Sequence, residues 1–376
     1  MLTNSIKKTA IINFIVLIVL LCIIDTVFRV VENFKEPAKA YREHKEFRLS
    51  RPEPYSHSNY FSKDFIQESF QQPQGWTTPI GTRIVIPNNY TGKWFNVQSN
   101  KRITVNQPRV FEKRILLFGG STIYNSEVPD NFTVSSLLQK KLAANGFSRI
   151  LVENFGVTSV HAAQQLERLQ RDVQLSENDI VIFYDGVNDV IFRVYYDNPE
   201  GWVSQQEQVK HAPFVARLVR KLKKYSAFMR WVDDNILVKS FSNSDKMQEA
   251  AIEYATTISK ANSHVLASQA KFIHFFQPTL FTKKNLNGYE VNLLTNLVGT
   301  DMVPVGLREA FEGTYPLMKN RLALFKFSFD LTNLYDDLDS SPYLDFCHVT
   351  ENANEILANE IFEKMNRLGY LSNSNK

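Results

Sequence analysis

Three residues of this sequence, Ser121, Asp345 and His348, have side chains that together could perform nucleophilic catalysis. A serine hydroxyl is almost fully protonated at neutral pH, so it attacks a carbonyl carbon only beside a base that accepts its proton. His348 can be that base, and Asp345 can bind the other ring nitrogen and stabilise the imidazolium. Ser121 directly follows Gly119 and Gly120, which suit a sharp turn against a ligand. These residues predict acyl transfer through a serine nucleophile.

Acyl transfer also needs hydrogen-bond donors for the oxyanion of the tetrahedral intermediate. We expect the backbone N–H groups of Ser121 and Gly156 and the side-chain amide of Asn188 to supply them, because each follows an apolar run. A simpler interpretation stays open for each motif. Ser121 can cap a helix, and Asn188 can form a turn with Asp189, which we interpret as structural.

The candidate site residues follow short apolar segments that are typical of buried parallel strands. These segments are residues 114–118, 150–154, 180–184 and 271–276, and a fifth strand is expected within 327–334. Helical spacing of apolar residues predicts helices at 133–145, 162–169 and 354–368. Strands that alternate with helices form a parallel sheet covered on both faces, and such sheets bind ligands at the carboxyl ends of their strands.

The order of these residues along the chain resembles the motifs of the SGNH (GDSL-like) hydrolase superfamily: Ser121, Gly156, Asn188, and then the pair Asp345 and His348. The resemblance covers roughly residues 111 to 368. It implies a three-layer α/β/α sandwich with a parallel, flavodoxin-like sheet. It also implies the same roles for the five residues: a catalytic triad of Ser121, Asp345 and His348, and an oxyanion hole of Ser121, Gly156 and Asn188.

Two short stretches depart from the family pattern. Residues 351–354 read Glu-Asn-Ala-Asn where relatives often carry a glycine, and residues 123–125 lack the small residue that is common there. The departures concern the shape of the pocket and the substrate rather than the triad.

An apolar segment at residues 9–31 is long enough to cross a membrane, since about 23 helical residues at 1.5 Å each span a ~30 Å hydrocarbon core. No small-residue cleavage site follows it, and Cys22 lacks the preceding small residue that lipoprotein processing needs. We therefore favour an uncleaved anchor over a signal peptide or a buried helix. Lys7 and Lys8 favour a cytoplasmic N-terminus, which places the rest of the chain outside the cytoplasm, in a periplasm or at a cell surface.

The expected organisation is a cytoplasmic tail (1–8), the anchor (9–31), a stalk (32–60), a small β-rich accessory segment (61–110) and the hydrolase domain (111–372) with an insertion at 191–248. The accessory segment contains Trp76 and Trp94, which we expect to pack, with sugar binding as the alternative. A basic run at 213–232 within the insertion predicts a solvated amphipathic helix, or else a contact with anionic headgroups or an anionic polymer.

Composition narrows the classes of function. The 376 residues are 44% hydrophobic and carry 43 Lys and Arg against 39 Asp and Glu, with no basic run interleaved with aromatics of the kind that single-strand binders use. Nucleic acid is therefore not an expected partner. The two cysteines, Cys22 and Cys347, predict no disulfide, which fits a bacterial periplasm or surface. No histidine has metal-binding spacing, so neither a metal nor another cofactor is expected, and His274 is expected to pack inside a strand.

The sequence thus predicts a membrane-anchored serine esterase that removes an O-acyl group from a carbohydrate or surface glycan, or hydrolyses another ester, through an acyl-enzyme on Ser121. An O-acyltransferase with the same triad is the near alternative. A glycan-binding or assembly protein without turnover, built on an SGNH scaffold, is an alternative of a different class.

Overall fold

The computed structural model describes residues 4–34, 52–70, 76–79, 82, 84–196, 198, 226–228, 244–296, 303 and 306–371, and the statements below refer to these residues. Most of the expected insertion, with nearly all of the basic run, and the stalk between residues 35 and 51 lie outside them.

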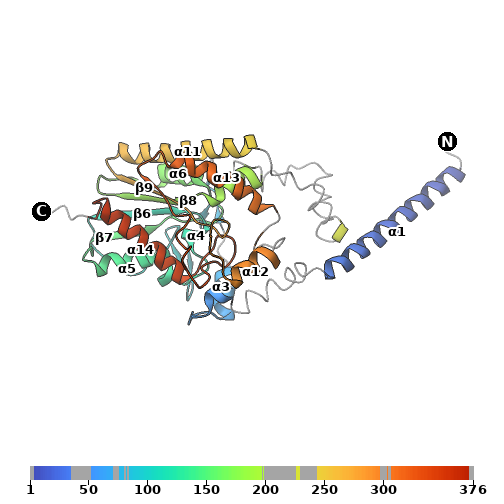
Figure 1. The fold of residues 1–376 in the computed structure, drawn as a ribbon, viewed down its shortest axis with the longest axis horizontal. Coiled ribbons are helices and arrows are strands. Elements are labelled where there is room, and N and C mark those ends of the chain that lie inside the picture. The colour runs from blue at the N-terminus through green and yellow to red at the C-terminus, as the bar shows by residue number, and fades with distance from the viewer. Residues whose placement is uncertain are drawn as a thin grey trace.

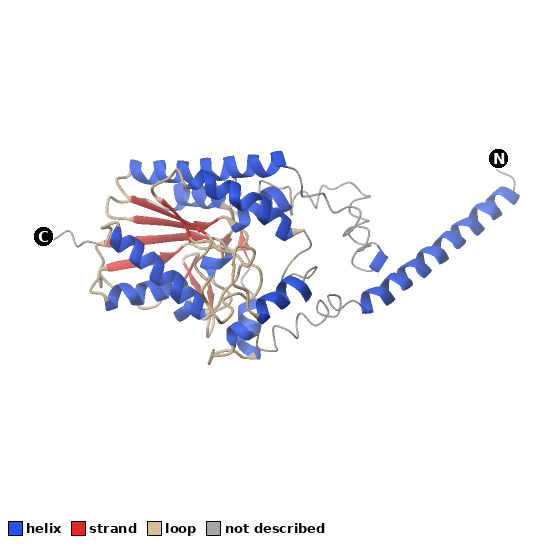
Figure 2. Ribbon diagram, in the orientation of Figure 1, coloured by secondary structure: helices blue, strands red, loops and turns tan. Residues whose placement is uncertain are grey.

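Five parallel strands form the centre of the fold, in the order β7-β6-β8-β9-β10 (Figure 1 and Figure 2). They are β6 (Lys113–Gly119), β7 (Ile150–Asn154), β8 (Ile180–Asp185), β9 (Lys271–Phe276) and β10 (Ser328–Asp330). Numbered along the chain this is the 2-1-3-4-5 order of flavodoxin-like sheets. The five predicted strands and the predicted fold class are confirmed.

Both faces of this sheet are buried, which explains why its strands read as continuous apolar runs. Along β6, Leu116 and Phe118 face one apolar cluster, whereas Ile115 and Leu117 face another. The first cluster is covered by α6 (Ala162–Asp172), α11 (Ser244–Ala267) and α13 (Leu307–Leu322). The second is covered by α5 (Val134–Ala144) and α14 (Glu351–Arg367). The result is the three-layer sandwich that the sequence predicted.

Shorter helical turns lie in the connections between these elements. They are α4 (Ser121–Tyr124), η2 (Asp130–Phe132), α7 (Val187–Val190), η3 (Ile191–Tyr195) and α12 (Gly288–Asn296). Two of them, α4 and α7, follow β6 and β8 directly, so they begin at the carboxyl edge of the sheet.

The accessory segment continues the central sheet. Antiparallel strands β5 (Lys101–Arg102), β4 (Asn96–Gln98) and β3 (Tyr90–Thr91) follow β7, and the junction is the pairing of Arg102 with Asn154. A separate two-stranded sheet pairs β1 (Trp76–Thr77) with β2 (Ile86–Pro87), and α3 (Lys63–Phe70) precedes it. Beyond the pairing of Arg102 with Asn154, side-chain amides bind the edge of β7. Gln139 accepts the N–H of Val152 and donates to the carbonyl of Ile150, and Gln107 donates to the carbonyl of Val152.

Residues 52–60, which the sequence analysis assigned to the stalk, pack against the domain. The turn η1 (Glu53–Tyr55) buries Tyr55, and the carbonyl of Pro54 accepts a hydrogen bond from Thr350 Oγ1 at 3.0 Å. Ser58 and Tyr60 donate hydrogen bonds to the carboxylate of Glu351, the first residue of α14. This stretch therefore contacts the start of the helix that follows His348.

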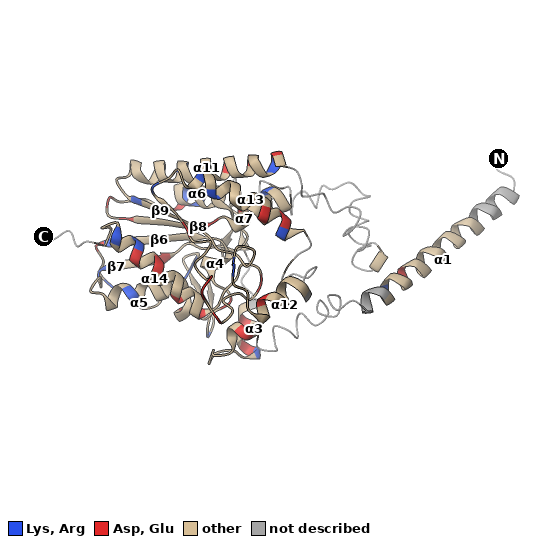
Figure 3. Cartoon of the chain, viewed as in Figure 1, with Lys and Arg blue, Asp and Glu red and all other residues tan. Residues whose placement is uncertain are grey.

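The helix α1 (Asn4–Phe34) extends beyond the predicted anchor at both ends and projects away from the sandwich in Figure 1. Its segment Ile12–Val30 has 19 residues with a mean hydropathy of 2.4, and none of it is buried against the rest of the chain. Charged residues are sparse along it (Figure 3). By length and composition, α1 can cross a membrane.

Candidate active site

The nucleophile candidate, Ser121, lies where β6 ends and α4 begins, at the carboxyl edge of the sheet. Gly120 is the residue between the strand and the helix, and an added Cβ there would lie 2.5 Å from Nδ2 of Asn188. Glycine is therefore needed at 120 because any side chain would collide with the Asn188 amide. The turn brings Ser121 and Asn188, from two different strand ends, to the same place.

His348 joins Ser121 to Asp345 in one chain of hydrogen bonds. Its Nδ1 lies 2.7 Å from Oδ2 of Asp345, and its Nε2 lies 2.7 Å from Oγ of Ser121. An ionised carboxylate can only accept, so Nδ1 carries the proton and Nε2 accepts the hydrogen bond that Ser121 donates. Oδ1 of Asp345 also accepts the backbone N–H groups of Cys347 and His348, each at 2.8 Å. These bonds fix the orientation of the carboxylate.

The electrostatics of the pair suit a general base. Burial alone would raise the pKa of Asp345, but the His348 ring and the two backbone N–H groups outweigh burial and lower that pKa to about 2. Burial alone would lower the pKa of His348, but Asp345, Cys347 and Glu127 raise it well above its usual value. His348 therefore gains a proton readily, and Asp345 stays ionised.

The three expected oxyanion donors differ in how they are engaged. The amide of Asn188 donates to the carbonyl of Val160 at 2.7 Å, which fixes its rotamer and leaves its second N–H for a ligand. Gly156 packs so closely on α4 that an added Cβ would lie 2.4 Å from the backbone nitrogen of Tyr124. Its own N–H donates to Oδ1 of Asn154 at 2.9 Å. An oxyanion role for Gly156 would require that hydrogen to be shared, so this role stays a prediction.

Asn154 is a site-supporting residue that the sequence analysis missed. Its Nδ2 donates to the carbonyl of Ile123 at 2.8 Å and to Oγ of Ser135 at 3.1 Å, so its amide ties the end of β7 to α4. The signal for it in the sequence is a polar residue at the end of an apolar strand, where such sheets bind ligands.

Glu127 is a second residue that the sequence analysis missed. Its side chain is only 8% exposed, and its Oε1 lies 3.9 Å from Nε2 of His348. The hydroxyl of Tyr55 donates to its backbone carbonyl at 2.7 Å. No local pattern marks Glu127, because both contacts depend on tertiary structure.

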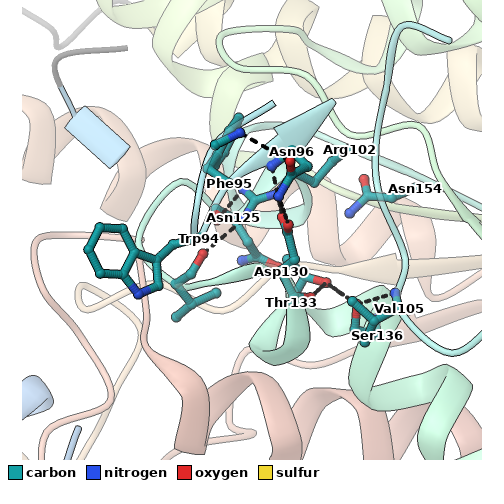
Figure 4. A network of polar contacts seen from close by, with 12 residues as sticks. Trp94, Phe95, Asn96, Arg102, Val105, Asn125, Asp130, Thr133, Ser136 and Asn154 are labelled. Atoms are coloured by element: carbon teal, nitrogen blue, oxygen red, sulfur yellow. Dashed lines mark hydrogen bonds and ion pairs between the residues drawn. The ribbon is translucent and has the colours of Figure 1, made fainter. Parts of the chain in front are cut away.

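A buried arginine, Arg102, binds the loop that contains Glu127, and Figure 4 shows this arginine beside Asp130 and Asn125. Arg102 Nε pairs with Oδ1 of Asp130 at 2.6 Å, and its Nη atoms donate to the carbonyls of Asn125 and Val128, each at 2.9 Å. The guanidinium carbon lies 3.5 Å from the centre of the Phe95 ring. Because all of these partners are buried or part-buried, removing Arg102 would leave several acceptors unsatisfied.

Behind the site lies a buried polar cluster. Asp185, at the end of β8, accepts a hydrogen bond from Tyr254, whose hydroxyl also lies 2.9 Å from Nε2 of His274. His274 is fully buried inside β9, and its Nδ1 contacts Oγ of Ser328 at 2.7 Å. Asp189 is also fully buried, and burial with the nearby Asp185 charge raises its pKa to about 8. These residues support the turn after β8 and have no contact with Ser121.

Among the described residues, the group that could bring metal-ligand atoms together is Asp345, Cys347 and His348, whose atoms lie within 4.8 Å of one another. Two of the three residues are already engaged in the hydrogen-bond chain to Ser121. A metal there would replace that chain, so the arrangement fits proton transfer better than metal binding.

The sequence matches no family model and no curated protein. Solved structures with a similar fold include an acetyl xylan esterase, AlAXEase, at 14% identity and a TM-score of 0.37, covering 67% of this chain and 98% of that one. A lipase/acylhydrolase from Enterococcus faecalis matches at 14% identity and a TM-score of 0.40, covering 68% and 97%. A catalytic mutant of an acetylxylan esterase from Geobacillus stearothermophilus matches at 13% and 0.39, covering 68% and 95%. At these TM-scores, the chemistry has to be argued from the site itself.

Proposed function

We propose that this chain is an SGNH-type serine hydrolase that cleaves a carboxylic ester. The observation that carries the proposal is the hydrogen-bonded chain from Ser121 Oγ through His348 to Asp345, with both contacts at 2.7 Å. Its position at the carboxyl edge of a flavodoxin-like sheet supports the proposal, because ligands of such sheets bind there.

The reaction follows from the positions of the protons. Ser121 Oγ attacks the ester carbon while its proton passes to Nε2 of His348, and Asp345 stabilises the imidazolium. His348 returns the proton to the leaving alcohol oxygen as the C–O bond breaks, which leaves an acyl group on Ser121. Water then attacks the acyl carbon and gives one proton to His348. The bond between the acyl carbon and Ser121 Oγ breaks as His348 returns this proton to Oγ, and the acid is released.

The oxyanion that forms in each half of the reaction needs donors that are already in position. The Ser121 N–H lies in the first turn of α4, where helix N–H groups have no partner within the helix. The free N–H of the Asn188 amide lies beside it across Gly120. Together with Gly156, if its hydrogen is shared, they form the proposed oxyanion hole.

The finer assignment is an O-acyl group on a carbohydrate or surface glycan, processed outside the cytoplasm by a single-pass membrane protein. The apolar segment Ile12–Val30 and the lysines before it support this location. A domain held there faces the glycans of the cell envelope. Transfer of the acyl group to a sugar hydroxyl, in place of water, would use the same residues.

The test compares the full chain in detergent with Ser121→Ala, using p-nitrophenyl acetate and a fluorophosphonate probe. Ser263→Ala is the matched control, because Ser263 is exposed on α11. We expect labelling and turnover in the wild type and in the control, and neither in folded Ser121→Ala. A folded wild type that neither labels nor turns over would overturn the proposal. Acylated product on an added glycan would identify a transferase.

A further inference from the structure

Two carboxylates flank the His348 ring, one beside each nitrogen. Asp345 binds Nδ1, as the orienting acid of a triad does. Glu127 lies on the other side, with its Oε1 3.9 Å from Nε2. In the proposed reaction Nε2 gives a proton to the leaving alcohol and takes one from the attacking oxygen. Glu127 therefore has a carboxylate oxygen within 3.9 Å of the atom that exchanges a proton with the alcohol oxygen.

The position of Glu127 is fixed by the fold. Tyr55 donates to the carbonyl of Glu127, and Arg102 donates to the carbonyls of Asn125 and Val128 on either side of it. The Glu127 side chain is also largely buried, at 8% exposed. These bonds fix the backbone around Glu127, and burial limits the rotamers of its side chain, which favours recognition of a particular group.

The separation of 3.9 Å between Oε1 and Nε2 decides what can fit. An oxygen can lie within ordinary hydrogen-bond distance of both atoms at once. Water has two protons and can donate one to each. The oxygen of an alcohol has only one proton, and His348 transfers that proton during the reaction. An alcohol can therefore donate a hydrogen bond to Glu127 only from a second hydroxyl on a neighbouring carbon.

We propose that Glu127 is a specificity residue that binds the alcohol part of the ester, so that the site prefers esters of polyhydroxyl alcohols with a free hydroxyl next to the ester. The inference rests on the proposed esterase function and deepens it. The same carboxylate repels an anionic group at that position, because like charges placed together in a partly desolvated site are unfavourable.

The test measures kcat/KM of the full chain on two acetates that differ by one methyl group: ethylene glycol monoacetate and its methyl ether. We use kcat/KM because it reports steps up to the acyl-enzyme and leaves deacylation out. We expect the wild type to favour the free hydroxyl by roughly 10- to 100-fold. Glu127→Ala brings the ratio to about one, and Glu127→Gln gives an intermediate ratio because its amide oxygen still accepts.

A second readout uses the acetate ester of glycolate, whose alcohol part carries a carboxylate. Both Glu127 variants should process it at least about threefold better than the wild type, relative to the methyl ether. Glu312→Gln is the matched control, because Glu312 is an exposed glutamate on α13, and it should leave both ratios unchanged.

The outcomes separate the two proposals. A wild type that turns over both acetates with the same ratio as Glu127→Ala would overturn the role of Glu127 and leave the esterase standing. A folded wild type that turns over neither acetate and does not label with fluorophosphonate would refute the esterase, and the role of Glu127 with it. Thermal unfolding of each variant verifies that the compared proteins are folded.

Discussion

Replacing Asp345 with asparagine tests the proton relay most directly. In Asp345→Asn, Oδ1 can still accept the backbone N–H groups of Cys347 and His348, so the loop keeps its two bonds of 2.8 Å. The new Nδ2 replaces the oxygen that lay 2.7 Å from Nδ1 of His348, and it donates where the carboxylate accepted. The ring then carries its proton on Nε2, which can no longer accept the proton of Ser121.

The expected losses can be estimated from this geometry. A histidine held in the wrong tautomer lowers kcat by about 10⁴-fold in proteases with a Ser-His-Asp triad, and we expect a loss of similar size here. The lowered pKa of about 2 for Asp345, against an ordinary value near 3.9, corresponds to about 2–3 kcal/mol of stability. Because the folded pKa is the lower one, that stability is present above about pH 4 and is lost as the pH falls towards 2.

The assay is p-nitrophenyl acetate turnover together with urea unfolding near neutral pH. Asp337→Asn is the matched control, because Asp337 is exposed in the loop before the triad aspartate and should change neither quantity. An Asp345→Asn protein that is folded and retains activity within tenfold of the wild type would refute the relay described here.

Three further predictions concern the oxyanion, the base and the buried acid pair. Asn188→Ala should lower kcat on p-nitrophenyl acetate by about 10²- to 10³-fold with little change in KM, because one oxyanion donor is lost. The kcat/KM of the wild type should rise with pH through an apparent pKa above the usual histidine value of about 6.5, because only unprotonated His348 can act as the base. Glu127→Gln should lower the midpoint of this pH profile, because the Glu127 charge helps to raise the pKa of His348. Asp189 has a raised pKa of about 8, so the folded state holds a proton that the unfolded state lacks, and stability falls as pH rises from about 4 to 8. Asp189→Asn should flatten that fall between about pH 5 and pH 8, measured as urea midpoints, and an unchanged slope would contradict the assignment.

The parallel strands and the contact between Asp345 and His348 could be predicted because their signals are local. Short apolar runs such as residues 180–184 are typical of strands buried on both faces, and β8 is buried along its whole length. The spacing of Asp345 and His348 within one loop allowed their contact to be inferred. The position of Ser121 opposite them required the motif order of the whole family.

The features that could not be predicted from the sequence depend on contacts between distant segments. Nothing near Arg102 indicates that it pairs with Asn154 at the sheet edge and binds the loop after α4. Glu127 was missed for the same reason. Asp336 lies in an acidic stretch with Asp337 and Asp339, yet it is buried and accepts the backbone N–H of Lys284. In each case the partner is supplied by tertiary structure, which periodicity does not encode.

The contacts of residues 52–60 decide where the α/β domain can be separated from α1. A shortened protein that starts at residue 111, where the hydrolase motifs begin, would lose the Tyr55 hydroxyl that holds Glu127 and the Pro54 carbonyl that binds Thr350. It would also lose Arg102 and the strands β3, β4 and β5, which continue the sheet beyond β7. A version without α1 should therefore begin before residue 52, because Tyr55 and Pro54 bind Glu127 and Thr350, which lie close to His348.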